Sequence, residues 1–271
     1  TFPASTSKVH MAGQGKRRMS IKRKKPQSNS STMKRVSIKK KAQSSSSENK
    51  GLAIVLLSGG IDSCVTTAIA NAEHTIALLH VGYSQRTQSR EYKSFRAIAN
   101  YYKVPEARIF STKIDYLSKI GGSSLTDQDI PVDKDSTKSQ IPLSYVPFRN
   151  THLLSIAVSW AEIIKAEEVY IGAVQQDSPD YPDCRAKYFD AFNRLVKVGT
   201  RPSTNIKVVT PLLEMNKAKI VKKGIELNAP LHLTWSCYEK NDIACGRCQS
   251  CTLRLKAFKD ARVKDKIPYT Q

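Results

Sequence analysis

The stretch Leu52-Ala-Ile-Val-Leu-Leu-Ser-Gly-Gly-Ile-Asp-Ser63 decides the fold of this chain. Its first six residues form a short apolar run, which is typical of a buried parallel strand. The Ser-Gly-Gly turn that follows leads into a helix whose first turn carries Asp62 and Ser63. Together they predict an anion site, because glycines let backbone N–H groups approach a phosphate and the helix dipole favours negative charge.

The turn is not a Walker P-loop, because no Gly-Lys-Ser/Thr follows it. It resembles the pyrophosphate loop (PP-loop) of ATP pyrophosphatases, enzymes that cleave ATP between the α and β phosphates and activate an oxygen as its adenylate. A glycine turn without a ligand is the alternative. The resemblance implies Mg²⁺ with the nucleotide and ATP contacts from Leu57, Ser58, Gly59, Gly60, Ile61, Asp62 and Ser63.

Apolar runs and helical segments alternate along the chain. This alternation predicts an α/β fold, a doubly wound parallel sheet covered by helices on both faces. Ligands bind such sheets at the carboxyl ends of the strands, where the unusual polar clusters of this sequence fall. Beyond the first strand and helix, we expect strands at 75–81, 106–114, 167–173 and 206–210, and helices at 89–102 and 151–166.

Four cysteines near the C-terminus have the spacing of one tetrahedral metal site: Cys237, Cys245, Cys248 and Cys251. Four thiolates match the closed ligand set of structural zinc, which leaves no position for a catalytic water. We therefore expect one structural Zn²⁺ per chain. An iron–sulfur cluster uses the same ligands and remains an alternative. Buried or disulfide-bonded cysteines are disfavoured, because the last three cysteines are too crowded for paired disulfides.

Residues 1–50 differ in composition from the rest of the chain. They carry 14 basic side chains and one acidic side chain, a net charge of +13 out of +21, which leaves +8 for the other 221 residues. This serine-rich segment has too few large apolar residues to bury a core, so we expect a disordered tail. It can be a segment without function, an organelle-targeting leader or an arm that binds nucleic acid.

The remaining chain is long enough for an α/β domain with a small appendage. We expect an ATP-binding domain over residues 51–228, and a zinc-binding subdomain with a C-terminal helix over residues 229–271. The sequence contains neither a secretory h-region nor a run of roughly 20 apolar residues that could span a membrane. We therefore expect a soluble, cytoplasmic protein, unless the tail directs it to an organelle.

Three further segments carry candidate site residues. Tyr83-Ser-Gln-Arg86 follows the second expected strand, where a nucleotide base or ribose binds in doubly wound folds; an exposed loop is the alternative. Arg149 lies at a helix start, where a guanidinium can clamp phosphate or carboxylate, and Asn150 is the expected N-cap. Residues 121–145 form a long loop, either a lid or a disordered segment, that contains Asp127, Asp129, Asp133 and Asp135.

The segment Asp177-Ser-Pro-Asp-Tyr-Pro-Asp-Cys-Arg185 follows the fourth expected strand. Two prolines stiffen it, so Tyr181, Asp183 and Cys184 can read a substrate. A surface turn in which Asp183 caps the next helix is the alternative. Cys184 need not be a nucleophile. The single histidines are expected to be core or surface residues rather than ligands: His80, His152 and His232.

In this order, the motifs resemble the QueC family of queuosine biosynthesis, the 7-cyano-7-deazaguanine synthases. The resemblance runs from about Leu52 to Phe258 and implies an adenine nucleotide alpha hydrolase-like sheet. Family members usually carry glycine at the positions of Ser84 and Phe148. The motifs are Ser58–Ser63, Tyr83–Arg86 before Glu91, Ser124–Asp127, Tyr145–Asn150, Tyr181–Arg185, Thr234–Tyr238 and Cys245–Cys251.

The resemblance implies a ligase that forms C–N bonds. It converts 7-carboxy-7-deazaguanine, ammonia and two ATP into the nitrile, with an amide as intermediate, and a homodimer is expected. It implies catalytic roles for Asp62, Ser63 and Arg149, nucleotide contact by Tyr83, and deazaguanine contacts by Arg149, Tyr181, Asp183 and Cys184. The rival hypotheses are a PP-loop enzyme that inserts sulfur into tRNA and a non-catalytic zinc-ribbon module that binds nucleic acid.

Overall fold

The apolar run after Gly51 forms the central strand of a five-stranded sheet in the computed structural model, which describes residues 50–132, 141–175 and 181–270. All strand pairs are parallel, and the strand order is β3-β2-β1-β4-β5. This arrangement confirms the predicted fold class. The strands are β1 Leu52–Leu56, β2 Thr75–Gly82, β3 Ile109–Lys113, β4 Glu168–Ile171 and β5 Lys207–Val209.

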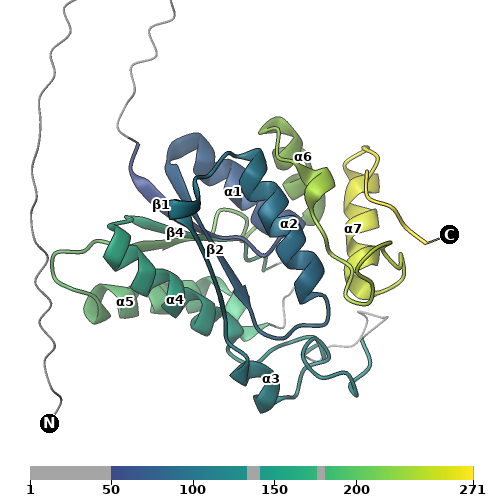
Figure 1. The fold of residues 1–271 in the computed structure, drawn as a ribbon, viewed down its shortest axis with the longest axis horizontal. Coiled ribbons are helices and arrows are strands. Elements are labelled where there is room, and N and C mark those ends of the chain that lie inside the picture. Colours follow the sequence, from purple (N-terminus) through teal and green to yellow (C-terminus); the bar gives the residue numbers. More distant parts are fainter. Residues whose placement is uncertain (1–49, 133–140, 176–180, 271) are drawn as a thin grey trace, which may run out of the picture. The chain divides into compact units, whose positions relative to one another are not determined.

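Helices cover both faces of this sheet (Figure 1). Side chains alternate along β1, so that Ile54 and Leu56 pack under one helical layer while Ala53 and Val55 pack under the other. One layer holds α4 Arg149–Ile164 and α5 Ala186–Gly199. The other layer holds α1 Ile61–Glu73, α2 Gln88–Tyr101, α6 Lys217–Glu226 and α7 Gln249–Asp260.

The order in which the chain adds strands to the sheet reverses between β1 and β4. From β1 it proceeds outward to β2 and β3, then returns to β4 on the opposite side of β1. A crevice forms at the carboxyl ends of two such strands, because their connections leave in opposite directions. Gly172 follows β4 there and packs against the first turn of α1: a Cβ at Gly172 would lie 2.9 Å from the carbonyl carbon of Asp62.

The expected third strand is shorter than the sequence indicates. Glu106–Arg108 forms a 3₁₀ turn, and only Ile109–Lys113 belongs to the sheet. Pro105 initiates this turn, and its carbonyl accepts a hydrogen bond of 2.8 Å from the backbone N–H of Arg108. Because that turn curls the chain, strand pairing starts three residues later than predicted. The other predicted strands are confirmed with ends that differ by one or two residues.

The expected helix at 151–166 begins and ends two residues earlier. Phe148, not Asn150, is the N-cap, and it has a left-handed backbone with φ of 58°. Lys165 ends the helix in the same conformation, also with φ of 58°. Asn150 lies in the first turn, so the predicted N-cap was wrong. The sequence analysis also placed no helix at α3 Tyr116–Ile120 or α6, which are both present.

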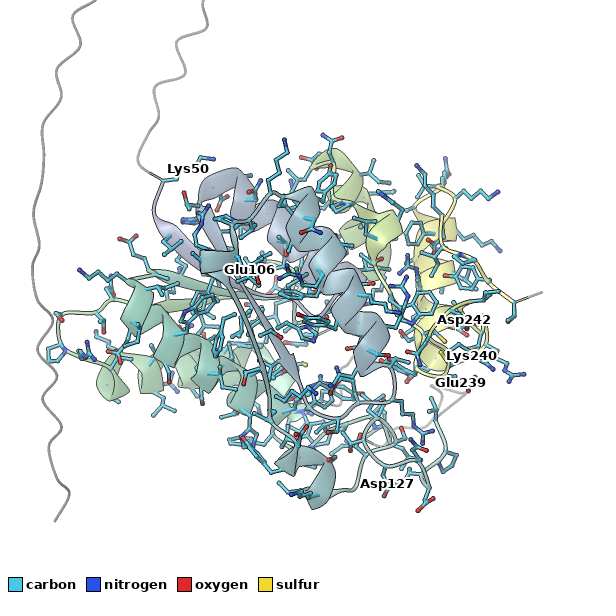
Figure 2. The ribbon with its side chains drawn as sticks, viewed as in Figure 1. Lys50, Glu106, Asp127, Glu239, Lys240 and Asp242 are labelled. Atoms are coloured by element: carbon cyan, nitrogen blue, oxygen red, sulfur yellow. The ribbon has the colours of Figure 1, made fainter. Side chains whose placement is uncertain are left out.

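Irregular segments and two 3₁₀ turns, η2 Pro182–Cys184 and η3 Leu231–Leu233, complete the described chain. The basic tail, together with Asp133, Asp135 and Asp177, lies outside the described residues. Within the described part, no helix is both long and apolar enough to cross a membrane. Figure 2 shows Asp127 beyond the carboxyl ends of the strands and Glu106 near their amino ends.

Candidate functional site

A cavity of about 330 Å³ lies where the carboxyl ends of β1, β2 and β4 meet the first turns of α1 and α4. Residues after η3 and on α7 close its other side, so segments more than 170 residues apart line one space. It contains most of the predicted site residues and is the candidate active site. Those that line it include Leu57, Ser58, Gly60, Ile61, Asp62, Ser63, Tyr83, Arg149, Tyr181 and Cys184.

The turn after β1 has the geometry of a phosphate cradle. Gly59 has φ of +97°, and a Cβ there would lie 2.6 Å from the backbone oxygen of Glu91. Only glycine fits this position, because both the backbone conformation and the packing exclude a side chain. The hydroxyls of Ser58 and Ser63 lie 3.0 Å apart, and Ser63 also donates to the backbone oxygen of Gly60. These contacts fix two hydroxyls beside the N-terminus of α1, where an anion is favoured.

Asp62 projects into the cavity from the first turn of α1. Its Oδ2 accepts a hydrogen bond from the Lys217 ammonium at 2.5 Å, while its Oδ1 is buried without a hydrogen-bond partner among the described residues. A buried carboxylate oxygen is costly to leave unpaired, so this atom is suited to a ligand such as a hydrated cation. Lys217 lies 155 residues from Asp62, and the sequence did not predict it as a site residue.

Arg149 and Tyr83 meet across the cavity. The guanidinium donates from Nη1 to the Tyr83 hydroxyl at 3.2 Å and lies 5.5 Å from the centre of the Tyr83 ring. Burial raises the pKa of Tyr83, so the phenol stays protonated at neutral pH. The first turn of α4 therefore presents a fixed cation at the carboxyl end of β2. Its role as a phosphate or carboxylate clamp stays a prediction.

Two of the three residues predicted for the proline-stiffened loop line the cavity. Tyr181 shares a hydrogen bond of 2.7 Å with Ser144, and burial raises the pKa of Cys184 to about 11. The Cys184 thiol is thus protonated, which agrees with the expectation that it need not be a nucleophile.

Asp183 is buried behind the cavity wall, with only 3% of its surface exposed. Its Oδ2 accepts a hydrogen bond of 3.0 Å from the backbone N–H of Asn150, and its own backbone oxygen accepts one of 2.8 Å from the Asn150 amide. Asp183 therefore caps the first turn of α4, the helix that carries Arg149, rather than the next helix along the chain.

The segment after β2 is largely occupied with internal contacts. Gln85 accepts a hydrogen bond from the backbone N–H of Tyr83 and donates to Glu91. Arg86 donates to the backbone oxygens of Ser124, Asp127 and Ile130, each at 2.7 Å. Arg86 therefore holds the start of the 121–145 loop. Tyr83 and Gln85 remain on the cavity wall, as expected for a nucleotide-binding segment.

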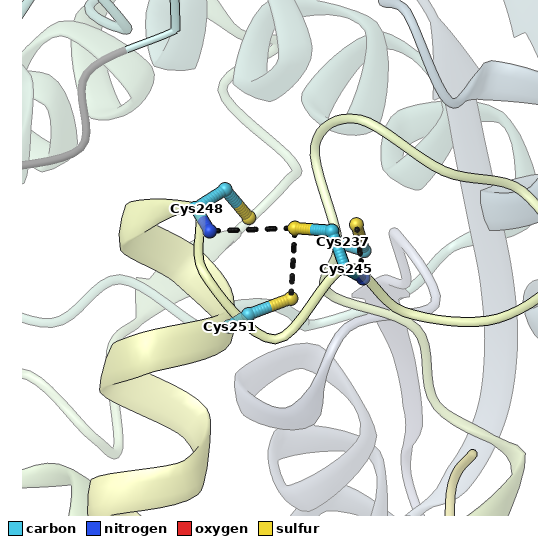
Figure 3. A group of neighbouring side chains, drawn as sticks. All are labelled: Cys237, Cys245, Cys248 and Cys251. Atoms are coloured by element: carbon cyan, nitrogen blue, oxygen red, sulfur yellow. Dashed lines mark hydrogen bonds between the residues drawn. The ribbon is translucent and has the colours of Figure 1, made fainter. Parts of the chain in front are cut away.

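The four predicted metal ligands lie together (Figure 3). All four are buried, and their sulfur atoms lie within 4.8 Å of one another. The Cys245 and Cys251 sulfurs are 3.9 Å apart, close to the edge of about 3.8 Å expected for a tetrahedron with Zn–S bonds of about 2.3 Å. This cluster can hold a metal ion.

Backbone N–H groups support the cysteine cluster. Glu239, Lys240 and Cys245 donate to the Cys237 sulfur, and Cys248 donates to the Cys245 sulfur, at 3.3–3.4 Å. Such donors stabilise thiolates, the form in which cysteine binds a metal.

The segment between η3 and the cysteines joins this cluster to the PP-loop. The backbone N–H of Trp235 donates to the Gly59 oxygen at 2.9 Å, and the Arg90 guanidinium lies 4.4 Å from the centre of the Trp235 ring. Arg254, only 2% exposed, pairs with both carboxylate oxygens of Asp265 and donates to the Thr234 hydroxyl. This buried ion pair was not predicted from the sequence.

A family model described as "Queuosine biosynthesis protein QueC" matches residues 52–262. The chain belongs to the QueC family. The 7-cyano-7-deazaguanine synthase of Chlorobium phaeobacteroides is 54% identical over 221 residues, which cover 81% of this chain and 97% of that protein. The synthase of Chloroherpeton thalassium is 50% identical over 219 residues, covering 80% of this chain and 96% of that protein.

Two departures from the usual QueC pattern coincide with strained backbone. Ser84 and Phe148, at which QueC proteins usually carry glycine, have φ of 60° and 58°. A side chain in this left-handed region costs roughly 1–2 kcal/mol, which glycine avoids. The glycines of the family pattern are thus explained by the backbone of these two turns.

Replacing Phe148 by glycine is expected to stabilise the protein by about 1 kcal/mol, because Phe148 is 57% exposed and loses little packing. That gain corresponds to a rise in melting temperature of roughly 2–4 °C, measurable by differential scanning calorimetry. Ile141→Gly is the control, because Ile141 is exposed but is not among the positive-φ positions of the described chain. An equal rise for both variants would contradict the explanation from backbone strain.

Proposed function

We propose that this chain converts 7-carboxy-7-deazaguanine and ammonia into 7-cyano-7-deazaguanine with ATP as the activating substrate. The similar proteins are named for the nitrile product. The observation that carries the proposal is one cavity that brings the PP-loop, including Asp62, together with Arg149.

Adenylation explains why ATP is required. A carboxylate is a poor electrophile, and its charge repels nucleophiles; adenylation supplies a leaving group and neutralises that charge. Ammonia then displaces AMP to give the amide. In a second round the amide oxygen is adenylated, and elimination of AMP leaves the nitrile. Both rounds require donors at the departing pyrophosphate and a cation near the developing charge.

The PP-loop side of the cavity is the proposed ATP subsite. Ser58, Ser63 and the start of α1 supply donors to the phosphates, and the Lys217 ammonium lies beside them. The unpaired Oδ1 of Asp62 suits Mg²⁺, which binds through one or two carboxylates together with substrate phosphates. The ATP contacts are Leu57, Ser58, Gly59, Gly60, Ile61, Asp62, Ser63 and Tyr83, with Asp62, Ser63 and Arg149 as catalytic residues.

The opposite side is the proposed deazaguanine subsite. Arg149 would pair with the substrate carboxylate, while Tyr181 and Cys184 line the wall beside it. Asp183 would act through the first turn of α4, because its carboxylate holds the backbone of Asn150. The substrate carboxylate is thereby directed toward the α-phosphate of ATP.

Asp183→Ala is expected to raise the KM for 7-carboxy-7-deazaguanine and to leave the KM for ATP within a few-fold. The variant leaves the Asn150 N–H unpaired, at a cost of roughly 1–3 kcal/mol, and loosens the helix start that carries Arg149. Steady-state kinetics with each substrate varied in turn measures the effect. Asp183→Asn keeps an acceptor oxygen and should be milder; an increase in the KM for ATP alone would contradict this role.

We propose zinc as the metal of the four-cysteine cluster and a structural role for it, because all four ligand positions are filled by protein. Residues 229–271 then form the zinc-binding subdomain and residues 51–228 the ATP-binding domain. The two share a core, since Ala257 and Phe258 of α7 pack in the same layer as α1 and β1. Thiols that bind metal also support a reducing compartment such as the cytoplasm.

We propose that the chain forms a homodimer. The edge strand β3 and helix α4 form a shallow surface hollow, in which the Phe110 and Trp160 rings lie 5.4 Å apart. It is lined by Phe110, Ser155, Ile156, Ser159 and Trp160. Docking of a second copy over these partly exposed side chains would remove apolar surface from water. Sedimentation velocity should show a dimer for the wild type and a monomer for Trp160→Glu. A monomeric wild-type protein would exclude the proposed dimer.

Mass spectrometry tests the reaction directly. Incubation with ATP, ammonia and 7-carboxy-7-deazaguanine should yield the nitrile together with AMP and pyrophosphate. Formation of a thiolated tRNA instead would favour the sulfur-insertion enzyme, and the absence of any turnover would favour a binding module. The same assay on a chain that begins at Gly51 tests whether residues 1–50 contribute; we expect unchanged turnover.

A further inference from the structure

The proposed reaction releases protons that the groups described above do not accept. When ammonia displaces AMP, the new C–N bond forms, the bond from carbon to the AMP oxygen breaks, and one N–H proton must leave. The amide nitrogen then loses one proton as its oxygen attacks the α-phosphorus and a second as AMP is eliminated. A base near the reacting carbon accelerates such steps, typically by about 10²- to 10⁴-fold.

Most of the titratable groups on the cavity wall are unsuited to accept these protons. Burial raises the pKa of Tyr83, Tyr181 and Cys184, so each is already protonated. Lys217 is a cation paired with Asp62. Among the described residues that line the cavity, the carboxylates are Asp62 and Glu91. Asp62 already faces an ammonium and the proposed metal, which leaves Glu91.

We infer that Glu91 is a catalytic residue of the proposed reaction and accepts the protons released from the substrate nitrogen. Glu91 lines the cavity from the first turn of α2. Its Oε2 accepts a hydrogen bond from Gln85 at 2.8 Å, and its Oε1 accepts one from Thr87 at 2.9 Å. Each carboxylate oxygen has a second lone pair, so these two donors orient the group without saturating it.

Glu91 lies between the two proposed subsites. Its backbone oxygen is next to Gly59 of the PP-loop, and its carboxylate interacts electrostatically with Arg149. The adenylate joins the substrate carboxyl group to the α-phosphate, so its reacting carbon must lie between the same two subsites. Burial raises the pKa of Glu91, which makes its carboxylate a stronger base than a solvated one. Between steps Glu91 passes the proton to solvent or to the departing AMP or pyrophosphate.

Isotope exchange separates this role from the proposed function on which it rests. In the first adenylation the substrate carboxylate attacks the α-phosphorus and no proton leaves, so exchange of labelled pyrophosphate into ATP measures that step alone. We expect Glu91→Gln to keep the pyrophosphate exchange that depends on 7-carboxy-7-deazaguanine within a few-fold of the wild-type rate. Nitrile formation by the same variant should fall by about 10²-fold or more. Glu106→Gln is the matched control, because its carboxylate is exposed and pairs with Arg96.

Three outcomes would overturn the inference. Nitrile formation by Glu91→Gln at the wild-type rate would show that Glu91 accepts no proton. An equal loss of exchange and nitrile formation would show that it positions ATP or supports the fold. If the wild-type chain shows no pyrophosphate exchange that depends on 7-carboxy-7-deazaguanine, the proposed function itself is refuted, and the inference with it.

Discussion

Replacing Cys248 by serine is expected to abolish metal binding and, with it, to remove most of the yield of soluble protein. Binding of structural Zn²⁺ contributes apparent free energies of about 10–16 kcal/mol in zinc-finger peptides, more than the whole stability of many domains. The cluster is fully buried, and removal of one thiolate leaves three negative or polar sulfurs without their ion. Metal analysis by mass spectrometry and thermal unfolding measure the two effects.

The loss should also reach the ATP subsite. The segment that precedes Cys237 donates from the Trp235 backbone to Gly59 of the PP-loop, and the Trp235 ring packs under Arg90. If the segment from Cys237 to Cys251 unfolds, Trp235 is no longer held against Gly59 and Arg90. Any Cys248→Ser protein that remains soluble should therefore bind ATP more weakly than wild type, as measured by calorimetry.

Cys64→Ser is the matched control for this experiment. Cys64 is fully buried in α1, where burial raises its pKa to about 12, and it belongs to the core rather than to the cysteine cluster. Its replacement is expected to leave the zinc content at one per chain. A Cys248→Ser protein with full zinc content and unchanged stability would contradict the ligand assignment, and iron with visible absorption would identify a cluster instead.

Features coded by neighbouring residues were predictable from the sequence. The run from Leu52 to Ser63 contains its own strand, glycine turn and helix start, and the structure has all three in place. The cysteine cluster is equally local, because three of its ligands fall within seven residues. The alternation of apolar runs and helices also predicted the parallel sheet, although Pro105 shortened one strand.

Side-chain contacts between different elements of the fold were not predictable from the sequence. Lys217 is one of four lysines on α6, and nothing in that segment distinguishes it; only the packing of α6 beside α1 brings it to Asp62. The role of Asp183 was likewise hidden, because its partner Asn150 belongs to another helix. Arg254 looked like one more charge on a basic helix, yet Asp265 makes it a buried ion pair. Each depends on tertiary contacts between residues far apart in sequence or on different elements.

Asp62→Ala is expected to lower kcat by about 10²- to 10³-fold, the usual effect of removing one group that stabilises developing charge. The variant removes the carboxylate oxygen proposed to hold Mg²⁺ and also removes the ion pair between Asp62 and Lys217. Turnover is followed as AMP and pyrophosphate released per nitrile formed. Asp242→Ala, at an exposed position between Cys237 and Cys245, should retain wild-type turnover (Figure 2).

Asp62→Asn separates the two roles of this side chain. Asparagine keeps an oxygen that can accept the hydrogen bond from Lys217, but it lacks the negative charge that Mg²⁺ requires of a ligand. If charge at the metal is what matters, Asp62→Asn should be as slow as Asp62→Ala, and higher Mg²⁺ concentrations should partly restore its rate. Recovery of most activity in Asp62→Asn would show that Asp62 acts by positioning Lys217, and release of only ADP and orthophosphate by the wild type would contradict adenylation altogether.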